Sequence, residues 1–430
     1  MIPPAVRALF RNTPTVAPVP NRAILSVTGS DTKDFLNGIG RVLHDAFAYS
    51  HVTPAGKNGY LIEYDASSSE APPLLSALKR FVLRAKVRLR DVTEEYDVWA
   101  AWGSEKETLW ETERHWQFAR SGAIEPDWME DQTWPWGHEP YTVQDRRSVG
   151  MGHRLLVKKG ERPSEAVTHD LATAYDYTLH RILHGVPEGV TDIIPTHAFP
   201  MDSNLDFMGA LDFRKGCYVG QELTVRTFHT GILRKRTWPV LISSSSPNSP
   251  DTPIPSLPPH LDIRPRIAET DGENPVKVRP RGTGKLLSTV GNVGLALLRV
   301  QQAKMAEKGH INLEFDVKNE NDEESRLGFS IQGFDGPPVL EFLLAQDTTR
   351  KAHRTAAVYQ RPQTVQVNHI HAVSKQHPAR PAHRRRRLDG PAAESRSGLS
   401  GTSSRTDVTR RGSYALEIRS QHRGSLREIS

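Results

Sequence analysis

The stretch KGCYVGQELTVRTFHTGILRKR, residues 215–236, contains the single cysteine of a chain of 430 residues. Cys217 directly follows Gly216 and lies three residues before Gly220, and Lys215 carries a positive charge close to the thiol. The two glycines allow a tight turn or the close approach of another backbone. The residues after Gly220 favour a helix, which would place the thiol near the positive end of a helix dipole. Such surroundings favour the thiolate, the nucleophilic and metal-binding form of cysteine.

Two interpretations of Cys217 are open from the local sequence. A free cysteine is commonly a small, buried hydrophobic side chain without a chemical role. The other interpretation is a reactive thiol. Because the chain has no second cysteine, Cys217 cannot form a disulfide within it, which argues against a disulfide-rich secreted scaffold. An iron–sulfur cluster needs about four ligands, so Cys217 could supply only one of them. A partner chain or a small thiol would have to supply the others.

The net charge of +6 comes from one end of the chain. Residues 346–430 hold 17 Lys/Arg and 6 Asp/Glu, whereas the rest holds 39 and 44. This terminal stretch contains the run Arg384–Arg387 and no apolar pattern, so we expect a disordered basic tail. The mildly acidic remainder predicts no nucleic-acid partner. No apolar run approaches the ~20 residues of a membrane-spanning helix, so we expect no membrane span.

The first 20 residues have the composition of a mitochondrial transit peptide. They contain Arg7 and Arg11, and the first acidic residue of the chain is Asp31. This bias is typical of matrix-targeting leaders, although early prolines weaken a helix here and a frayed terminus is the competing interpretation. We predict import into the mitochondrial matrix and removal of roughly the first 15–25 residues.

Alternating strand and helix patterns predict an α+β fold class. Ser30 is a predicted N-cap and Gly185 a predicted C-cap. Residues 241–260 carry six prolines and six serines, which indicates a linker before a smaller β-rich domain. The predicted strands are 23–28, 60–64, 86–92, 285–290 and 294–300, and the predicted helices are 31–39, 74–84, 169–184 and one after Gly220. The predicted buried face of the helix 169–184 consists of Leu171, Tyr175, Thr178, Leu179 and Ile182.

The cysteine segment resembles the signature of the folate-binding YgfZ/GcvT-like family, in its mitochondrial branch of iron–sulfur cluster assembly factors. The resemblance extends over residues 22–345. Further similar blocks follow the family order: GRVLHDAFAY (40–49), LRDVTEEYDVWAAWG (89–103), VGMGHRLLV (149–157), HRILHGVPEGVTDIIPTHAFPMDSNLDFM (180–208) and GKLLSTVGNVGLALLRV (284–300). It implies the fold of the glycine-cleavage T-protein, a ring of two related α+β lobes around an opening that can receive folate, plus a small C-terminal β-barrel.

This fold divides the chain into six expected parts. The division is a leader at 1–20, a first lobe at 21–150, a second lobe with the KGCYVGQE motif at 151–240, a linker at 241–260, a C-terminal barrel at 261–345 and a basic tail at 346–430.

The resemblance implies a role in the late mitochondrial pathway that builds [4Fe–4S] clusters, alongside A-type cluster carrier proteins. It makes Cys217 the candidate catalytic residue, as a transient ligand of a shared cluster or as a reactive thiol. Arg226 is the candidate cofactor-binding residue, with tetrahydrofolate as a possible cofactor. The other signature positions are Lys215, Gly216, Tyr218, Gly220, Gln221 and Glu222, followed by Thr224 and His229. We expect an assembly factor rather than a conventional enzyme.

The alternative is a tetrahydrofolate-dependent one-carbon transferase of the aminomethyltransferase type. Two departures from the family pattern disfavour it. A block that includes a strand pair is missing between DFLNGIG (34–40) and RVLHDAFAY (41–49). Leu183 stands where the T-protein carries a glutamate that binds the pterin ring, and a leucine cannot accept those hydrogen bonds.

Overall fold

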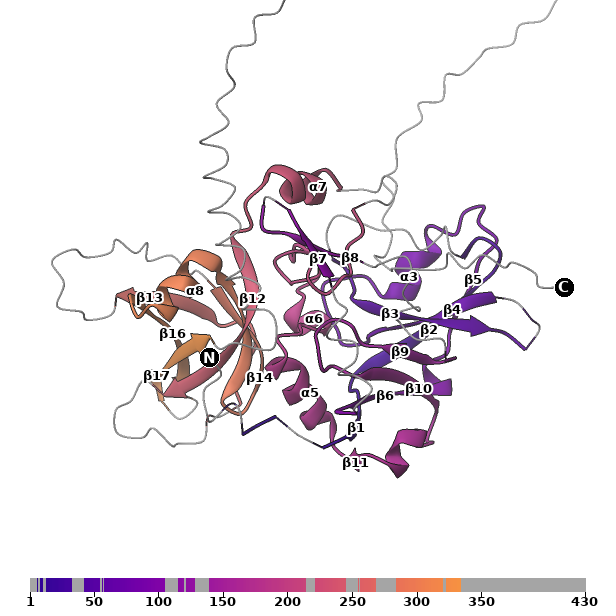
Figure 1. Cartoon of the computed structure of the whole chain (residues 1–430), viewed down its shortest axis with the longest axis horizontal. Helices are drawn as coiled ribbons and strands as arrows, with labels where there is room; N and C mark the ends of the chain where they lie inside the picture. Colours follow the sequence, from indigo (N-terminus) through magenta and orange to yellow (C-terminus); the bar gives the residue numbers. More distant parts are fainter. Residues whose placement is uncertain are drawn as a thin grey trace, which may run out of the picture. The chain divides into compact units, whose positions relative to one another are not determined.

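The computed structural model describes most of the chain up to residue 333 (Figure 1). The described residues are 6, 8–10, 13–32, 42–54, 56, 58–104, 115–119, 121–127, 139–213, 221–244, 254, 256–267, 284–319 and 322–333. All of them belong to the larger of two structural units, which comprises Met1–Arg350 and Ser413–Ser430. The tail 346–430, and the predicted helix 31–39 beyond Thr32, lie outside the described residues.

A four-stranded antiparallel sheet forms the core of the first lobe. Its strand order is β3-β4-β2-β5, and Leu25 of β2 pairs with Ile62 of β4. Alternating apolar residues of β2 and β4 pack against Leu74 and Leu78 of the helix α3. The bounds are Arg22–Thr28 for β2, Ala46–Val52 for β3, Asn58–Asp65 for β4, Arg88–Asp91 for β5 and Leu74–Lys79 for α3. The three strand predictions are confirmed, whereas α3 ends five residues earlier than predicted, ahead of the exposed Leu83 with its left-handed φ of 37°.

A five-stranded sheet of order β11-β1-β6-β10-β9 joins residues from both predicted lobes. The strands are β1 (Thr15–Pro18), β6 (Tyr96–Trp102), β9 (Thr142–Gln144), β10 (His153–Lys158) and β11 (Asp170–Leu171). Leu155 of β10 pairs with Trp99 of β6, so the expected lobe boundary at residue 150 does not separate two sheets. The correction follows from long-range strand pairing, which local patterns do not reveal.

The strand β1 lies inside this sheet, between β11 and β6. Val16 and Ala17 are fully buried, and Val6 is buried against a second apolar cluster. The expected leader at 1–20 therefore includes residues 15–18, which form a strand of this sheet. The short apolar stretch TVAP forms a strand because it pairs with the neighbouring strand β6.

The helix α5 (Ala174–Leu183) begins with a capping box, in which Thr173 and Asp176 satisfy each other's backbone N–H groups. It ends at the predicted glycine, because Gly185 adopts a φ of +65° and the Val186 N–H donates to the Arg181 carbonyl. The predicted buried face was wrong for two members, since Leu171 is 50% and Tyr175 is 59% exposed. Ile182 is buried as predicted, together with Tyr177, His180, Arg181 and Leu183, because α5 contacts both β1 and the barrel strands β14 and β15.

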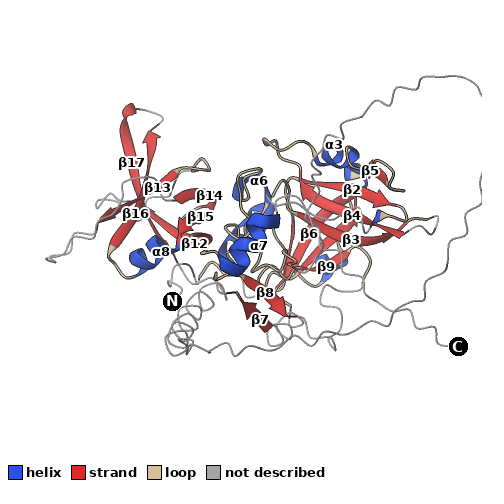
Figure 2. Ribbon diagram, turned by 90° about the horizontal axis from the view of Figure 1, so that it is seen from above, coloured by secondary structure: helices blue, strands red, loops and turns tan. Residues whose placement is uncertain are grey.

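The C-terminal domain is a closed barrel of six strands in the order β12-β15-β14-β13-β16-β17 (Figure 2). The strands are β12 (Lys235–Ser244), β13 (Asp262–Ile267), β14 (Gly284–Val290), β15 (Val293–Arg299), β16 (Ile311–Asn319) and β17 (Asp322–Gly333), and the helix α8 (Val300–Glu307) contacts β15, β16 and β17. The predicted strand pair corresponds to β14 and β15, joined through Gly291 with a φ of +56°. Leu286 belongs to the main core, whereas Leu287 packs towards α5.

The barrel begins at Lys235 rather than at the expected residue 261. Its first strand, β12, pairs with both β15 and β17 and so closes the cylinder. The expected lobe end at 240 falls within β12, and the expected linker loses residues 241–244 to the same strand. The composition of 241–260 could not show this, because Ser243 and Ser244 owe their strand conformation to pairing with β17.

The remaining elements connect the two sheets and the barrel along the sequence. They are η1 (Thr93–Glu95), the hairpin of β7 (His115–Phe118) and β8 (Ile124–Asp127), η2 (Ser164–Val167), α6 (Gly189–Asp192) and α7 (Gln221–Thr230).

Candidate functional site

The helix α7 carries the end of the cysteine signature and confirms the helix predicted after Gly220. The segment that holds Lys215, Gly216, Cys217, Tyr218 and Gly220 lies outside the described residues. Phe213, just before that segment, stacks on Phe228 of α7 with ring centroids 3.8 Å apart and an interplanar angle of 26°. This aromatic contact therefore joins the described residues that lie before and after the cysteine segment.

One side of α7 is anchored and the other faces solvent. Thr224 is buried, and the Ser121 hydroxyl donates to the Phe228 carbonyl at 2.8 Å. Glu222, Arg226 and His229 are exposed. Of the predicted signature residues, Glu222 and Arg226 therefore lie one helical turn apart on the accessible surface. Gln221 is placed at the start of the helix.

A buried ion pair holds the strand that follows the signature. Arg236 of β12 donates to both carboxylate oxygens of Asp206, at 2.5 and 2.8 Å. The same guanidinium donates to the carbonyls of Met201 and Gly122, and the Ile124 N–H donates to Asp206. This bidentate pair ties the barrel to the loop before the signature and to the β7–β8 hairpin. Both residues lie in sequence blocks that resemble the family, but no pattern in the sequence predicts that they form an ion pair.

Asp202, which lies in the same loop as Asp206, has a raised pKa. Burial raises the pKa of its carboxyl to about 6, against the opposing attraction of Lys235 and Arg236.

A second set of buried charged residues connects the two sheets. Glu188, ahead of α6, accepts hydrogen bonds from Arg154 at 2.5 Å, from Arg147 at 2.6 Å and from the Tyr177 hydroxyl at 2.7 Å. Arg22 and Tyr49 donate to Glu63 at 2.7 and 2.5 Å. We name this set the central charge cluster; it comprises Arg22, Tyr49, Glu63, Asp145, Arg147, Arg154, Tyr177 and Glu188.

The central charge cluster is internally balanced. Burial opposes the charged form of Glu188, but Arg154 and Arg147 outweigh it and hold the pKa of Glu188 well below its usual value. Arg147 also forms a salt bridge with Asp145 at 2.7 Å. A buried charge is tolerated only when it is paired in this way. Sequence reasoning missed the cluster, and its only local signal was charged residues inside otherwise apolar blocks.

Asp192 extends this network to the barrel. Its carboxylate accepts from Arg181, from the Glu188 N–H at 3.1 Å and from the Ser288 N–H of β14 at 2.9 Å. Arg181 also donates to the Ser288 hydroxyl at 3.0 Å. The position of the barrel is thereby coupled to the loop that carries Glu188.

The position at which the resemblance implies a pterin-binding glutamate is occupied by a buried leucine. Leu183 is buried with Val6 and Leu287, in the cluster that faces the barrel. The Arg154 guanidinium lies 4.6 Å from the Phe47 ring centroid and 5.0 Å from that of Tyr177. Its charge is already paired with Glu188.

No group of three or more His, Cys, Asp or Glu side chains among the described residues is arranged to hold a metal ion. No described helix is both long and apolar enough to cross a bilayer.

Comparison with known proteins decides the family. A profile described as the CAF17 C-terminal β-barrel domain matches residues 234–319, which extend from the start of β12 to the end of β16. A Cryptococcus neoformans protein named "Iron-sulfur cluster assembly factor IBA57 homolog, mitochondrial" is 39% identical over 331 residues, covering 68% of this chain and 85% of that protein. The chain belongs to the IBA57 family. A Mycosarcoma maydis protein of the same name is 32% identical over 366 residues, covering 76% and 82%.

Membership of the IBA57 family confirms the resemblance that the cysteine segment predicted. The α+β class with a C-terminal barrel is confirmed as well. These relatives are named as mitochondrial proteins, in agreement with the basic N-terminus. A solved aminomethyltransferase of the glycine cleavage system from Bartonella henselae shares 12% identity and a TM-score of 0.44, over 76% of this chain and 87% of that one. That likeness is too distant to carry an argument about activity.

Proposed function

We propose that this chain is a mitochondrial iron–sulfur cluster assembly factor that works in the matrix and supports the maturation of [4Fe–4S] proteins. The observation that carries the proposal is the 39% identity to an assembly factor over 85% of that relative's length. The single thiol within KGCYVGQE is the second support, because the chemistry of cluster handling requires a thiolate or an equivalent ligand.

In this proposal the cluster is cargo, and Cys217 contributes one iron ligand while an A-type carrier protein contributes the others. The thiol precedes α7 by four residues, which suits a ligand near a helix N-terminus. Arg226 projects from the exposed side of that helix, and Lys215 flanks the thiol. Their positive charge supports an anionic thiolate and a negatively charged cluster.

Folate has no place as a reactant in this proposal. Leu183, which replaces the pterin-binding glutamate implied by the resemblance, is buried against the barrel residue Leu287 and cannot accept a hydrogen bond from the ring. The one-carbon transferase therefore gains no support from a described residue, and Arg226 is assigned to the cluster rather than to a cofactor.

The test replaces Cys217 by serine in cells that lack the endogenous factor. We expect the Cys217→Ser chain to fold, to lose cluster-dependent association with the carrier, and to leave aconitase activity low. A matched control carries Cys217→Ser together with Ser164→Cys, which moves the single thiol to an exposed position far along the chain. The control should fail as the serine variant does. Restored aconitase activity with either variant would refute the role of Cys217.

A further inference from the structure

The described residues near the N-terminus pack against α5 and the barrel. Val6 is fully buried, Leu9 and Phe10 are partly buried, and the Leu9 N–H donates to the Val6 carbonyl at 3.0 Å. The Phe10 ring meets the ring of His184 edge to face, with centroids 5.5 Å apart. Val6, Leu9 and Phe10 have the spacing i, i+3 and i+4, which places side chains on one face of a helical turn. This short segment therefore presents one apolar face to the rest of the protein.

The surface that receives this segment lies where α5 meets the outside of the barrel. Side chains alternate between the two faces of a strand, and on β15 Ala296 and Leu298 belong to the main core. The other face of β15 packs outward, in one apolar cluster with Val6 and with a stripe of α5. We name this surface the seam cluster; it comprises Leu179, Ile182 and Leu183 of α5 with Leu287, Val293 and Leu295 of the barrel.

The segment that covers the seam cluster lies within the stretch that we expect mitochondrial processing to remove. A cut between Phe10 and Thr15 leaves β1 in its sheet but takes away all three apolar contacts of the segment. The mature chain then carries outward-facing leucine, isoleucine and valine side chains without this cover. A contiguous apolar patch on a folded protein typically marks an interaction site.

We propose that the seam cluster is a docking surface for a helical segment of another matrix protein, and that residues 6–10 occupy it until processing. The partner segment carries apolar side chains at i, i+3 and i+4, because the chain's own segment fits the surface with this pattern. Docking of the apolar face of a helix on such a surface is a common mode of recognition. The ring of His184 favours an aromatic residue at i+4, through the edge-to-face contact that Phe10 makes.

This inference rests on the proposed import into mitochondria, but the docking step needs neither a cluster nor Cys217. A failure of the Cys217→Ser test would therefore leave it untouched, and a failure of docking would leave the role of Cys217 untouched. The probe is a fluorescently labelled peptide of residues 2–12, whose binding is followed by fluorescence anisotropy.

The peptide is titrated into the full-length chain and into a full-length variant with Leu9→Asp and Phe10→Asp. These changes place charges at two partly buried positions, so the segment no longer occupies the seam cluster. We expect saturable binding to the variant and binding at least about tenfold weaker to the unchanged chain, where the tethered segment competes at a high effective concentration. A peptide with the same two changes is the matched control and should bind neither chain.

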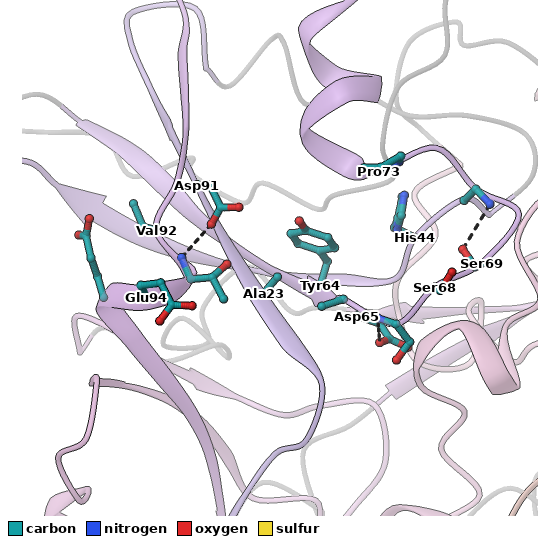
Figure 3. A pocket seen from close by; sticks show the side chains of 15 residues that line it. Ala23, His44, Tyr64, Asp65, Ser68, Ser69, Pro73, Asp91, Val92 and Glu94 are labelled. Atoms are coloured by element: carbon teal, nitrogen blue, oxygen red, sulfur yellow. Dashed lines mark hydrogen bonds between the residues drawn. The ribbon is translucent and has the colours of Figure 1, made fainter.

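A pocket of about 650 Å³ in the first lobe provides a second control (Figure 3). Tyr64, Asp91 and Glu94 line this pocket, and no member of the seam cluster does. Adding Glu94→Gln to the variant should therefore leave the affinity for the peptide unchanged. An affinity that is equal in the variant and the unchanged chain, or one that changes with Glu94→Gln, would overturn the proposal.

The remaining measurements test the fold and the occupant. Cooperative thermal unfolding shows whether the doubly substituted chain is folded, and Phe10→Ala, which removes only one ring, is the milder variant and should also bind the peptide more tightly than the unchanged chain does. Light scattering reports whether a second copy of the chain takes the surface instead. Dimers that the peptide does not dissociate, or the absence of peptide binding in both variants, would refute docking of a partner helix.

Discussion

Phe213 and Phe228 stack face to face with their ring centroids 3.8 Å apart, although fourteen positions of the signature region separate them. This contact holds the residue that leads into the cysteine segment against the helix that follows it. A loop whose two ends are fixed loses less conformational entropy when it binds a partner. The stacked pair therefore links the residues on either side of the segment that contains the only cysteine of the sequence.

Replacing Phe228 by alanine should free the cysteine segment. The ring is partly buried, so we expect a loss of about 1–3 kcal/mol in the free energy of unfolding. The rate of alkylation of Cys217, measured by mass spectrometry below the unfolding transition, should rise. Phe228→Leu keeps an apolar contact and serves as the control. Equal alkylation rates in the alanine variant and the unchanged chain would show that the stacked pair does not restrain the segment.

Removing the charge of Glu188 should be far more damaging than removing an exposed carboxylate. Glu188→Gln leaves the buried Arg154 without its main partner, and such a loss destabilises a protein by about 3–5 kcal/mol. Urea unfolding followed by far-ultraviolet circular dichroism measures the change. Glu161→Gln is the exposed control and should shift the free energy of unfolding by less than about 0.5 kcal/mol. Similar values for both variants would show that the ion pair adds nothing.

The protein should lose stability as the pH falls below neutrality, in part through His180. Burial, aided by the neighbouring His184, places the pKa of His180 well below its ordinary value of 6.5. His180 therefore binds a proton near pH 6 in the unfolded chain but not in the folded chain. Its contribution to the free energy of unfolding is fully present above about pH 6.5 and is lost as the pH falls. His44 acts in the same direction, whereas Asp202, with its raised pKa of about 6, acts in the opposite one.

The variant His180→Gln isolates this contribution. Its free energy of unfolding should depend less steeply on pH between about 6.5 and 5 than that of the unchanged chain, with a difference of up to about 1.4 kcal/mol per pH unit. Chemical denaturation at several pH values measures both slopes. Parallel slopes would show that His180 is protonated equally in both states.

Processing of the N-terminus should stop ahead of β1. Val16 and Ala17 are fully buried within the five-stranded sheet, and burying one valine contributes about 1.5–3 kcal/mol. Deleting residues 2–20 should therefore abolish cooperative unfolding, whereas deleting 2–11 should lower the thermal midpoint through loss of the Val6 contacts. Mass spectrometry of protein isolated from mitochondria should find an N-terminus before Thr15. A mature chain that starts after Pro18 and melts normally would contradict the assignment of β1.

Local patterns were sufficient for several elements of the fold. The strands β2, β14 and β15 follow from runs of apolar residues and turn residues, because side chains alternate between the two faces of any strand. The end of α5 follows from Gly185, since only glycine adopts a left-handed φ without strain. The α7 start after Gly220 and the family of the cysteine segment also required no spatial information.

The buried face of α5 and the closure of the barrel depended on neighbours that are distant in sequence. Tyr175 is 59% exposed, although its helix contacts β1 and the barrel strands β14 and β15. The contacts of Glu63 with Arg22 and of Glu188 with Arg154 join residues 41 and 34 positions apart. Local spacing carries no signal for such pairs. Only the folded chain removes these charges from water, and a buried charge then requires whichever opposite charge the packing of the sheets brings within hydrogen-bonding distance.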